Sequence, residues 1–128
     1  MANSKFLLSV VGADDSNEAK THNVVRALLD AGADKDAKTD NGSTPLTRAS
    51  ENGHESIVRA LLDAGADKDA KAAYGRTALT WASLKGHESI VRALLDAGAD
   101  RDAKTSNGST ALMWASQNGH ESCVRALL

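Results

Sequence analysis

The chain has 128 residues, a formal net charge of -2 and a pI near 6.0, so its charge balance does not predict a nucleic-acid-binding protein. No apolar run approaches the roughly 20 residues of a membrane span, and a single cysteine cannot form an internal disulfide. These features favour a soluble cytoplasmic protein. Its core must be built from Ala, Leu, Val and Ile, because aromatic residues make up 3% of the chain.

The first 39 residues are the least regular part of the chain. Apolar side chains at Phe6, Leu7, Leu8, Val10 and Val11 predict a helix near the N-terminus. The polar segment at residues 13–20 has no such pattern, so we expect it to be irregular, with an insertion at about residues 12–17.

A regular unit begins at residue 40 with a turn signal at residues 40–42. Thr44 can cap a helix with its hydroxyl, and Pro45 is tolerated at the first helical position. This short helix is expected to end at residues 52–53, and Gly65, in the left-handed position, is expected to end a second one. The second helix carries apolar residues at helical spacing, namely Ile57, Val58, Leu61 and Leu62.

Residues 54–67 recur letter for letter at 87–100, a period of 33 residues, and return at 120–128 with Cys123 in place of isoleucine. A fixed period of this size indicates a repeat architecture. The predicted units are 40–72, 73–105 and a truncated 106–128. Neither helix of a unit can bury its face alone, so neighbouring units must stack. Small residues permit the close approach, namely Ala49, Ala82 and Ala115.

The motifs that recur in register, at residues 41–46, 52–54, 58–62 and 65–67, resemble those of ankyrin repeats over roughly residues 24–128. The resemblance implies an all-α repeat solenoid, in which helix-turn-helix units stack and hairpin-like loops project from them. It also implies binding of other proteins on a concave face made by the loop tips and the first helices.

Three departures from the ankyrin pattern are expected to matter. The first unit, residues 1–39, is interpreted as a divergent N-terminal capping repeat, with a separate capping helix and without the usual first helix. The usual histidine of the first helix is replaced at Thr47, Thr80 and Met113, which alters one polar contact in each unit. The chain stops at Leu128, inside the second helix of the last unit, before any polar cap.

No catalytic, metal or cofactor site is predicted. Packed helices lie about 8–10 Å apart, whereas each histidine of a zinc site lies ~2.1 Å from the metal. The histidines at positions 54, 87 and 120 therefore cannot share an ion and are expected to satisfy loop backbone groups. Cys123 is expected in the core. Charges are expected to be solvated, both in the pairs Glu55/Arg59, Glu88/Arg92 and Glu121/Arg125 and in the loop residues Asp67, Lys68, Asp69 and Lys71.

Differences between the units fall mainly at the loop tips and on the first helix. In an ankyrin array both sets line the concave face, where Trp, Tyr and Arg dominate binding hot spots. Tyr74 and Trp81 are the predicted anchors. A second interpretation is that these positions vary freely and that the tryptophans pack against the neighbouring unit. The candidate partner-binding residues are Arg48, Glu51, Tyr74, Arg76, Trp81, Leu84, Lys85, Trp114 and Gln117.

The predicted function is therefore a non-catalytic protein–protein interaction module. The alternative is an engineered or consensus-like scaffold without a natural ligand, since the units are nearly identical. The C-terminal end is expected to expose apolar side chains and to support self-association or a continuation of the chain. The side chains concerned are Val124, Leu127 and Leu128, with part of Met113.

Overall fold

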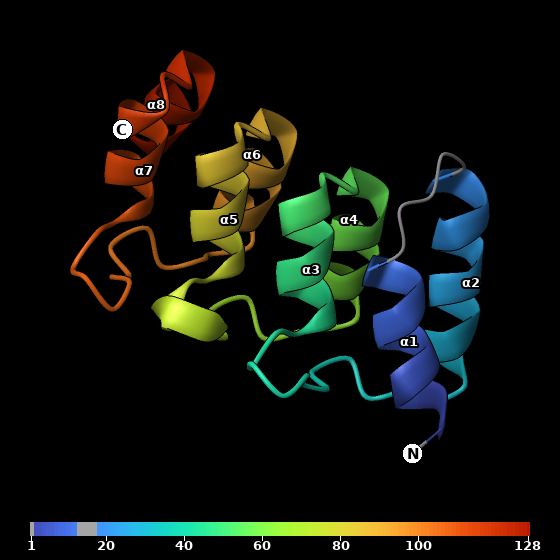
Figure 1. Ribbon diagram of the computed structural model, residues 1–128. Helices are drawn as coiled ribbons and strands as arrows, with labels where there is room; N and C mark the ends of the chain where they lie inside the picture. Colours follow the sequence, from blue (N-terminus) through green and yellow to red (C-terminus); the bar gives the residue numbers. More distant parts are fainter. Residues whose placement is uncertain (1, 13–17) are drawn as a thin grey trace.

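The computed structural model describes residues 2–12 and 18–128, and within these ranges the chain is helical and has no strand. Figure 1 shows the helices as successive pairs, with loops projecting from one side of the stack. The elements are α1 (Ala2–Gly12), α2 (Glu18–Asp30), α3 (Pro45–Asn52), α4 (Glu55–Asp63), the 3₁₀ turn η1 (Ala73–Gly75), α5 (Ala78–Lys85), α6 (Glu88–Asp96), α7 (Ala111–Gln117) and α8 (Glu121–Leu127).

The helices form two rows. The first helices of the units, α1, α3, α5 and α7, pack on one another in chain order, and the second helices α2, α4, α6 and α8 form the other row. Each first helix also packs against the second helix of its own unit. The predicted all-α repeat solenoid is therefore confirmed.

The N-terminal region differs from our expectation. Helix α1 packs against α2 and α3 in the same way as α3 packs against α4 and α5, so α1 is the first helix of the first unit and not a separate cap. Residues 18–20, expected to be irregular, form the first turn of α2. The polar composition of this turn misled the prediction because a helix start tolerates polar residues and favours acidic ones such as Glu18. The proposed insertion at residues 12–17 falls almost wholly outside the described residues.

Threonine pairs fix the start of the first helices. In α3 the Thr44 hydroxyl accepts from the Thr47 backbone N–H at 3.2 Å, and the Thr47 hydroxyl accepts from the Thr44 N–H at 2.8 Å. Thr77 and Thr80 form the same reciprocal capping box in α5. The threonines at the family's histidine position thus supply a polar contact of their own. Met113 has no hydroxyl, so α7 keeps one half of the arrangement, a bond of 3.4 Å to Thr110.

At two joints a histidine of the following unit packs over the glycine that ends the first helix of the unit before, His87 over Gly53 and His120 over Gly86, whereas Nε2 of His54 is buried without a hydrogen-bond partner. Gly86 has a φ of +80°, and a Cβ built there would lie 2.6 Å from Nδ1 of His120. Nε2 of His120 lies 3.0 Å from the carbonyl oxygen of Leu84, and Nε2 of His87 lies 3.3 Å from that of Glu51. These rings therefore reach the last turn of a helix in the preceding unit, where we had expected loop backbone groups.

The core lies between the two rows and continues from unit to unit. Ala49, Ala82 and Ala115 are fully buried, as their role in close packing requires, and Cys123 is buried in place of isoleucine. Fully burying one leucine or isoleucine side chain stabilises the fold by about 1.5–3 kcal/mol. The largest fully buried apolar side chains are Leu7, Leu46, Ile57, Leu61, Leu79, Ile90 and Leu94.

Loop aspartates connect consecutive units. The Asp36 carboxylate accepts from the backbone N–H of Asp67 at 2.8 Å, and the Asp69 carboxylate accepts from that of Asp100 at 2.8 Å. The loop charges were expected to be solvated at Asp67, Lys68, Asp69 and Lys71. Lys68 is half-buried and the other three are exposed, and the Asp69 carboxylate additionally holds the next unit in register.

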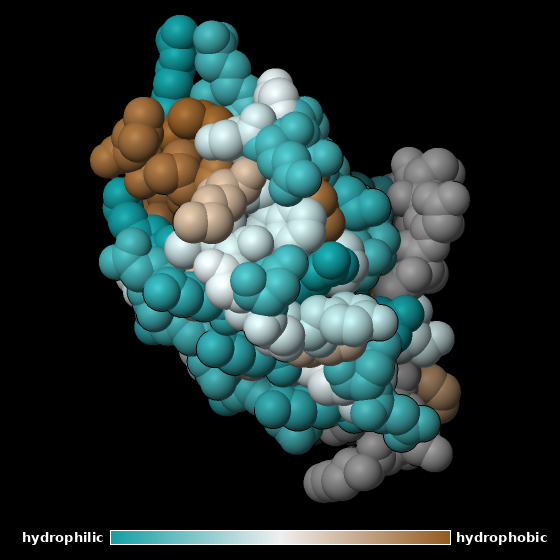
Figure 2. All heavy atoms as spheres, turned by 60° about the vertical axis from the view of Figure 1, so that its left-hand side comes forward, coloured by the Kyte–Doolittle hydropathy of each residue, from teal (hydrophilic) through white to brown (hydrophobic). Residues whose placement is uncertain are grey.

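The C-terminal end carries apolar surface. Figure 2 shows a brown, hydrophobic area over the end of the array that contains α7 and α8. Leu128 is 80% exposed, Met113 is 53% exposed and Val124 is half-buried, as expected. The expectation was wrong for Leu127, which is 5% exposed. It occupies the position of the fully buried Leu94 one unit earlier, so it faces the core and not the outer side.

Candidate protein-interaction surface

The loops and the first helices meet on one side of the stack. We call this side the concave face and define it by the loops 39–43, 70–77 and 103–110 together with α3, α5 and α7. The structure places all nine predicted residues there: Arg48 and Glu51 on α3, Tyr74 and Arg76 at η1, Trp81, Leu84 and Lys85 on α5, and Trp114 and Gln117 on α7.

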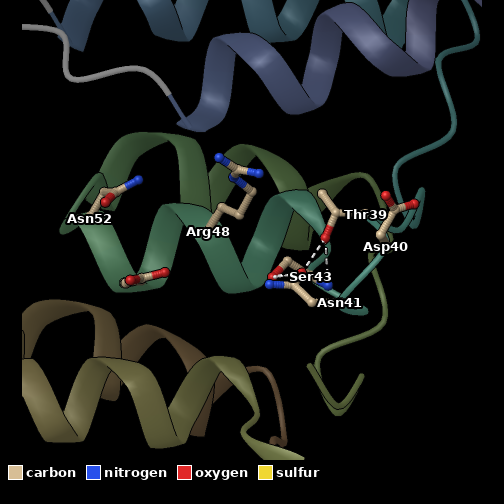
Figure 3. Close-up of a pocket in the computed structure, with 7 residues that line it drawn as sticks. Thr39, Asp40, Asn41, Ser43, Arg48 and Asn52 are labelled. Atoms are coloured by element: carbon tan, nitrogen blue, oxygen red, sulfur yellow. Dashed lines mark hydrogen bonds between the residues drawn. The ribbon is translucent and has the colours of Figure 1, made fainter. Parts of the chain in front are cut away.

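The unit of α3 presents a polar hollow of about 520 Å³ between its loop and its first helix. Figure 3 shows the loop residues gathered beside the start of α3, with Arg48 and Asn52 further along the helix. The loop is tied by its own side chains, since Ser43 donates its N–H to the Thr39 hydroxyl at 3.1 Å. The lining residues are Thr39, Asp40, Asn41, Ser43, Arg48, Glu51 and Asn52.

The next unit replaces this hollow with a stack of rings around Arg76. The Arg76 guanidinium carbon lies 4.8 Å from the ring centroid of Trp81, 5.3 Å from that of Trp114 and 5.6 Å from that of Tyr74. The three rings come from a loop and from two neighbouring units. Each such cation–π contact contributes about 0.5–1 kcal/mol at an exposed site and more where water is excluded. Sequence reasoning named all four residues but missed that Arg76 joins the other three.

The backbone at Tyr74 is unusual. Tyr74 has a φ of +63°, the left-handed conformation, and is the one residue other than glycine with a positive φ in the described ranges. A bulky side chain in this region costs about 1–3 kcal/mol. Its carbonyl oxygen accepts from the backbone N–H of Ser106 in the next loop at 2.8 Å, which helps to hold the conformation. The Tyr74 side chain is 73% exposed.

The two tryptophans are half-buried, which matches the interpretation that they pack against neighbouring groups. Their partner is the Arg76 guanidinium, however, and that group lies on the same face as the exposed Tyr74. Nε1 of Trp114 and Nε of Arg76 are buried without a hydrogen-bond partner. Lys85 and Gln117 are exposed, and Leu84 is half-buried.

A family model described as ankyrin repeats (3 copies) matches residues 16–72 and 68–128. The chain belongs to the ankyrin-repeat family. Ankyrin repeats generally act as protein–protein interaction modules and are typically non-catalytic. A comparison of the sequence with curated proteins finds no significant match.

Outside the concave face, the ankyrin framework shows ordinary structural groups. The outer helices carry the predicted ion pairs Glu55–Arg59, Glu88–Arg92 and Glu121–Arg125, at 2.9, 2.8 and 3.4 Å. The hydrogen bond from Arg92 lowers the pKa of the exposed Glu88 carboxyl. Burial raises the pKa of the Cys123 thiol, so the group stays protonated and unreactive.

Neither a metal cluster nor a membrane-spanning helix is found in the described part of the chain. No three His, Cys, Asp or Glu side chains among the residues it covers lie close enough together to hold a metal ion. None of the helices there is long and apolar enough to cross a membrane.

Proposed function

We propose that this ankyrin-repeat chain is a non-catalytic binding module that takes up a protein partner on its concave face, with Tyr74 and Trp81 as anchors. The observation that carries the proposal is the contrast between a constant framework and one unit-specific cluster of an arginine and three aromatic rings. Trp, Tyr and Arg are the residue types enriched at binding hot spots.

The strain at Tyr74 supports the same assignment. A glycine or asparagine would adopt a φ of +63° at lower cost, and the residues at the equivalent positions of the neighbouring units, Asn41 and Asn107, do not have a positive φ. Tyrosine at this position destabilises the fold and places a large ring in solvent. Binding is a reason to keep such a residue, because strained residues cluster at functional sites.

The first experiment locates the surface. A photo-reactive phenylalanine analogue, which keeps an aromatic ring, is placed at position 74, and in a matched control at Arg59, which is exposed on the outer helix α4. In extract of the source cell, position 74 should crosslink to a discrete protein that excess unlabelled chain displaces, and position 59 should not. The same products from both positions would contradict the proposal.

The second experiment measures the anchors against the partner so found. Tyr74→Ala and Trp81→Ala should each weaken binding by ~2 kcal/mol, about 30-fold in dissociation constant, while far-UV circular dichroism stays unchanged. Arg59→Ala should leave the affinity unchanged. An unaltered dissociation constant for both concave-face variants would reject these anchors.

The competing function is a structural scaffold, engineered or consensus-like, without a natural ligand. The near-identity of residues 54–67 and 87–100 favours it. The two functions differ in the crosslinking result, because a scaffold gives no displaceable product at position 74.

We also propose that the apolar end around Leu128 and Met113 supports self-association of the chain. Both side chains are more than half exposed. Sedimentation equilibrium should show a dimer that Leu128→Asp converts to a monomer. A monomer at high concentration for the parent chain would remove this proposal.

A further inference from the structure

The Arg76 guanidinium is held in place by rings but has no counter-ion. Among the described side chains no carboxylate forms an ion pair with it, and no hydrogen bond to its nitrogens is formed. Its Nε is buried, whereas its two terminal nitrogens are not. The group is therefore a fixed planar cation whose outer edge remains available.

A small hollow adjoins this edge. It has a volume of about 130 Å³ and is lined by Tyr74, Arg76, Thr105, Ser106, Asn107 and Trp114. The Asn107 side-chain oxygen accepts from the Thr105 hydroxyl at 2.6 Å, which leaves the Asn107 Nδ2 as a donor for an outside group. The hollow thus offers one cation and neutral donors, and its lining contains no acid.

The part of the concave face formed by residues 70–85 and 103–117 has one sign of charge, whereas the part formed by loop 39–43 and α3 also carries Asp40 and Glu51. In loops 70–77 and 103–110 and in helices α5 and α7 there is no aspartate or glutamate. The charged residues of these segments are Lys71, Arg76, Lys85 and Lys104, and the three lysines are exposed. This local excess of positive charge contrasts with the net charge of -2 of the whole chain.

From these observations we infer that the concave face of residues 70–117 binds an acidic segment of a protein, with one of its carboxylates seated on the terminal nitrogens of Arg76. The inference rests on the proposed function and names the chemistry of the partner. A planar guanidinium matches a carboxylate in two parallel hydrogen bonds, and the stacked rings pre-organise it so that little side-chain entropy is lost on binding.

Single-stranded nucleic acid is the other polyanion to consider, because proteins that bind it combine basic grooves with aromatic rings. Base stacking needs a free ring face. Here Trp81 and Trp114 are half-buried and hold the Arg76 guanidinium at 4.8 and 5.3 Å, so the exposed Tyr74 is the one ring of the cluster left for a base. The acidic protein segment is therefore the ligand that the geometry favours.

The test uses the full chain and a capped tetraglutamate peptide as the probe, with a tetraglutamine peptide as its neutral control. Binding is followed by nuclear magnetic resonance of the Arg76 Nε–H and of the two tryptophan indole N–H groups, in about 20 mM salt, where screening is weak. The glutamate peptide should shift these signals in a saturable manner, and the glutamine peptide should not.

Arg76→Ser is the decisive variant, because serine occupies the equivalent positions 43 and 109 of the neighbouring loops. It should raise the dissociation constant of the glutamate peptide at least ~10-fold. Arg76→Lys, which keeps the charge but loses the planar fork, should give an intermediate loss. Equal binding by Arg76→Ser, equal shifts with tetraglutamine, or tighter binding of oligothymidylate or inorganic phosphate would each overturn the inference.

The outcome is separable from that of the proposed function. If a protein crosslinks at position 74 but binds Arg76→Ser as tightly as the parent chain, the module stands and its acidic preference is overturned. If the glutamate peptide binds through Arg76 but no displaceable protein crosslinks, the carboxylate site is supported and the assignment of a natural partner fails.

Discussion

The contact between Gly86 and His120 allows the free energy of one contact between two units to be measured. Replacing Gly86 by alanine adds a Cβ 2.6 Å from Nδ1 and 2.8 Å from Cε1 of His120. The ring must move, which breaks the contact of its Nε2 with the Leu84 carbonyl at 3.0 Å. Losing this hydrogen bond costs about 0.5–1.5 kcal/mol, and the left-handed backbone costs alanine about another 1–2 kcal/mol.

Gly98 provides the matched control. It lies in the same unit with a φ of +89°, and a Cβ there would meet the flexible end of Lys68 at 3.5 Å, an ordinary contact. Gly98→Ala should therefore cost about 1–2 kcal/mol from the backbone alone, and Gly86→Ala about 1.5–3.5 kcal/mol. Urea unfolding followed by circular dichroism, with m-values unchanged, measures both free energies.

A double-mutant cycle isolates the ring. When His120→Ala is already present, the added methyl group has no ring to displace, so Gly86→Ala should cost about as much as Gly98→Ala. Equal costs for Gly86→Ala and Gly98→Ala in the parent chain would refute the argument that the histidine ring couples the two units.

Four further predictions concern the array itself. Met113→Thr should restore the capping box with Thr110 and raise the free energy of unfolding by about 0.5–1 kcal/mol in urea titrations; a decrease would contradict the role of the threonine pairs. Cys123, with its thiol pKa raised by burial above the ordinary 9.0, should react with a thiol reagent at least ~10-fold more slowly in the folded chain than in urea. Its neutral thiol stabilises the fold fully below pH 9.0, and this contribution is lost as the pH rises through the higher folded value, so pH titration of stability should show a decline there. Hydrogen exchange should be slowest in residues 40–105, since both units are flanked by neighbours, and uniform protection from α1 to α8 would contradict the one-dimensional picture.

The sequence predicts the repeating framework well because each signal is local. Thr44 caps a helix a few residues away, and the spacing of Ile57, Val58 and Leu61 sets a buried face that the structure confirms. The 33-residue period then implies the stacking. Helix α1 was misassigned because its unit departs from the period, so its place could be established only from its packing against α2 and α3.

The candidate site was predictable as a set of positions but not as an arrangement. Comparison of units identified the loop tips and first helices as variable. The position of the Arg76 guanidinium depends on rings from two units and on the left-handed turn at Tyr74. No local pattern encodes that turn, because tyrosine rarely adopts a positive φ. The hydrogen bond between Asp69 and the backbone of Asp100 was also missed, because the two residues lie 31 positions apart and no local pattern connects them.

Constant and variable positions contribute to the stability of the array in different ways. Repeated contacts, such as the histidine over its glycine and the aspartate bonds between loops, stabilise the joints at which they occur, independently of what the concave face carries. One unit can therefore hold a strained tyrosine at a cost of about 1–3 kcal/mol, while its neighbours carry asparagine at the same position. Because stability in such arrays is approximately a sum over units and joints, the concave face can change one unit at a time. In this chain the unit of residues 73–105 differs from its neighbours by the Arg76 stack. The stack connects two units through side chains that are not part of the repeated framework.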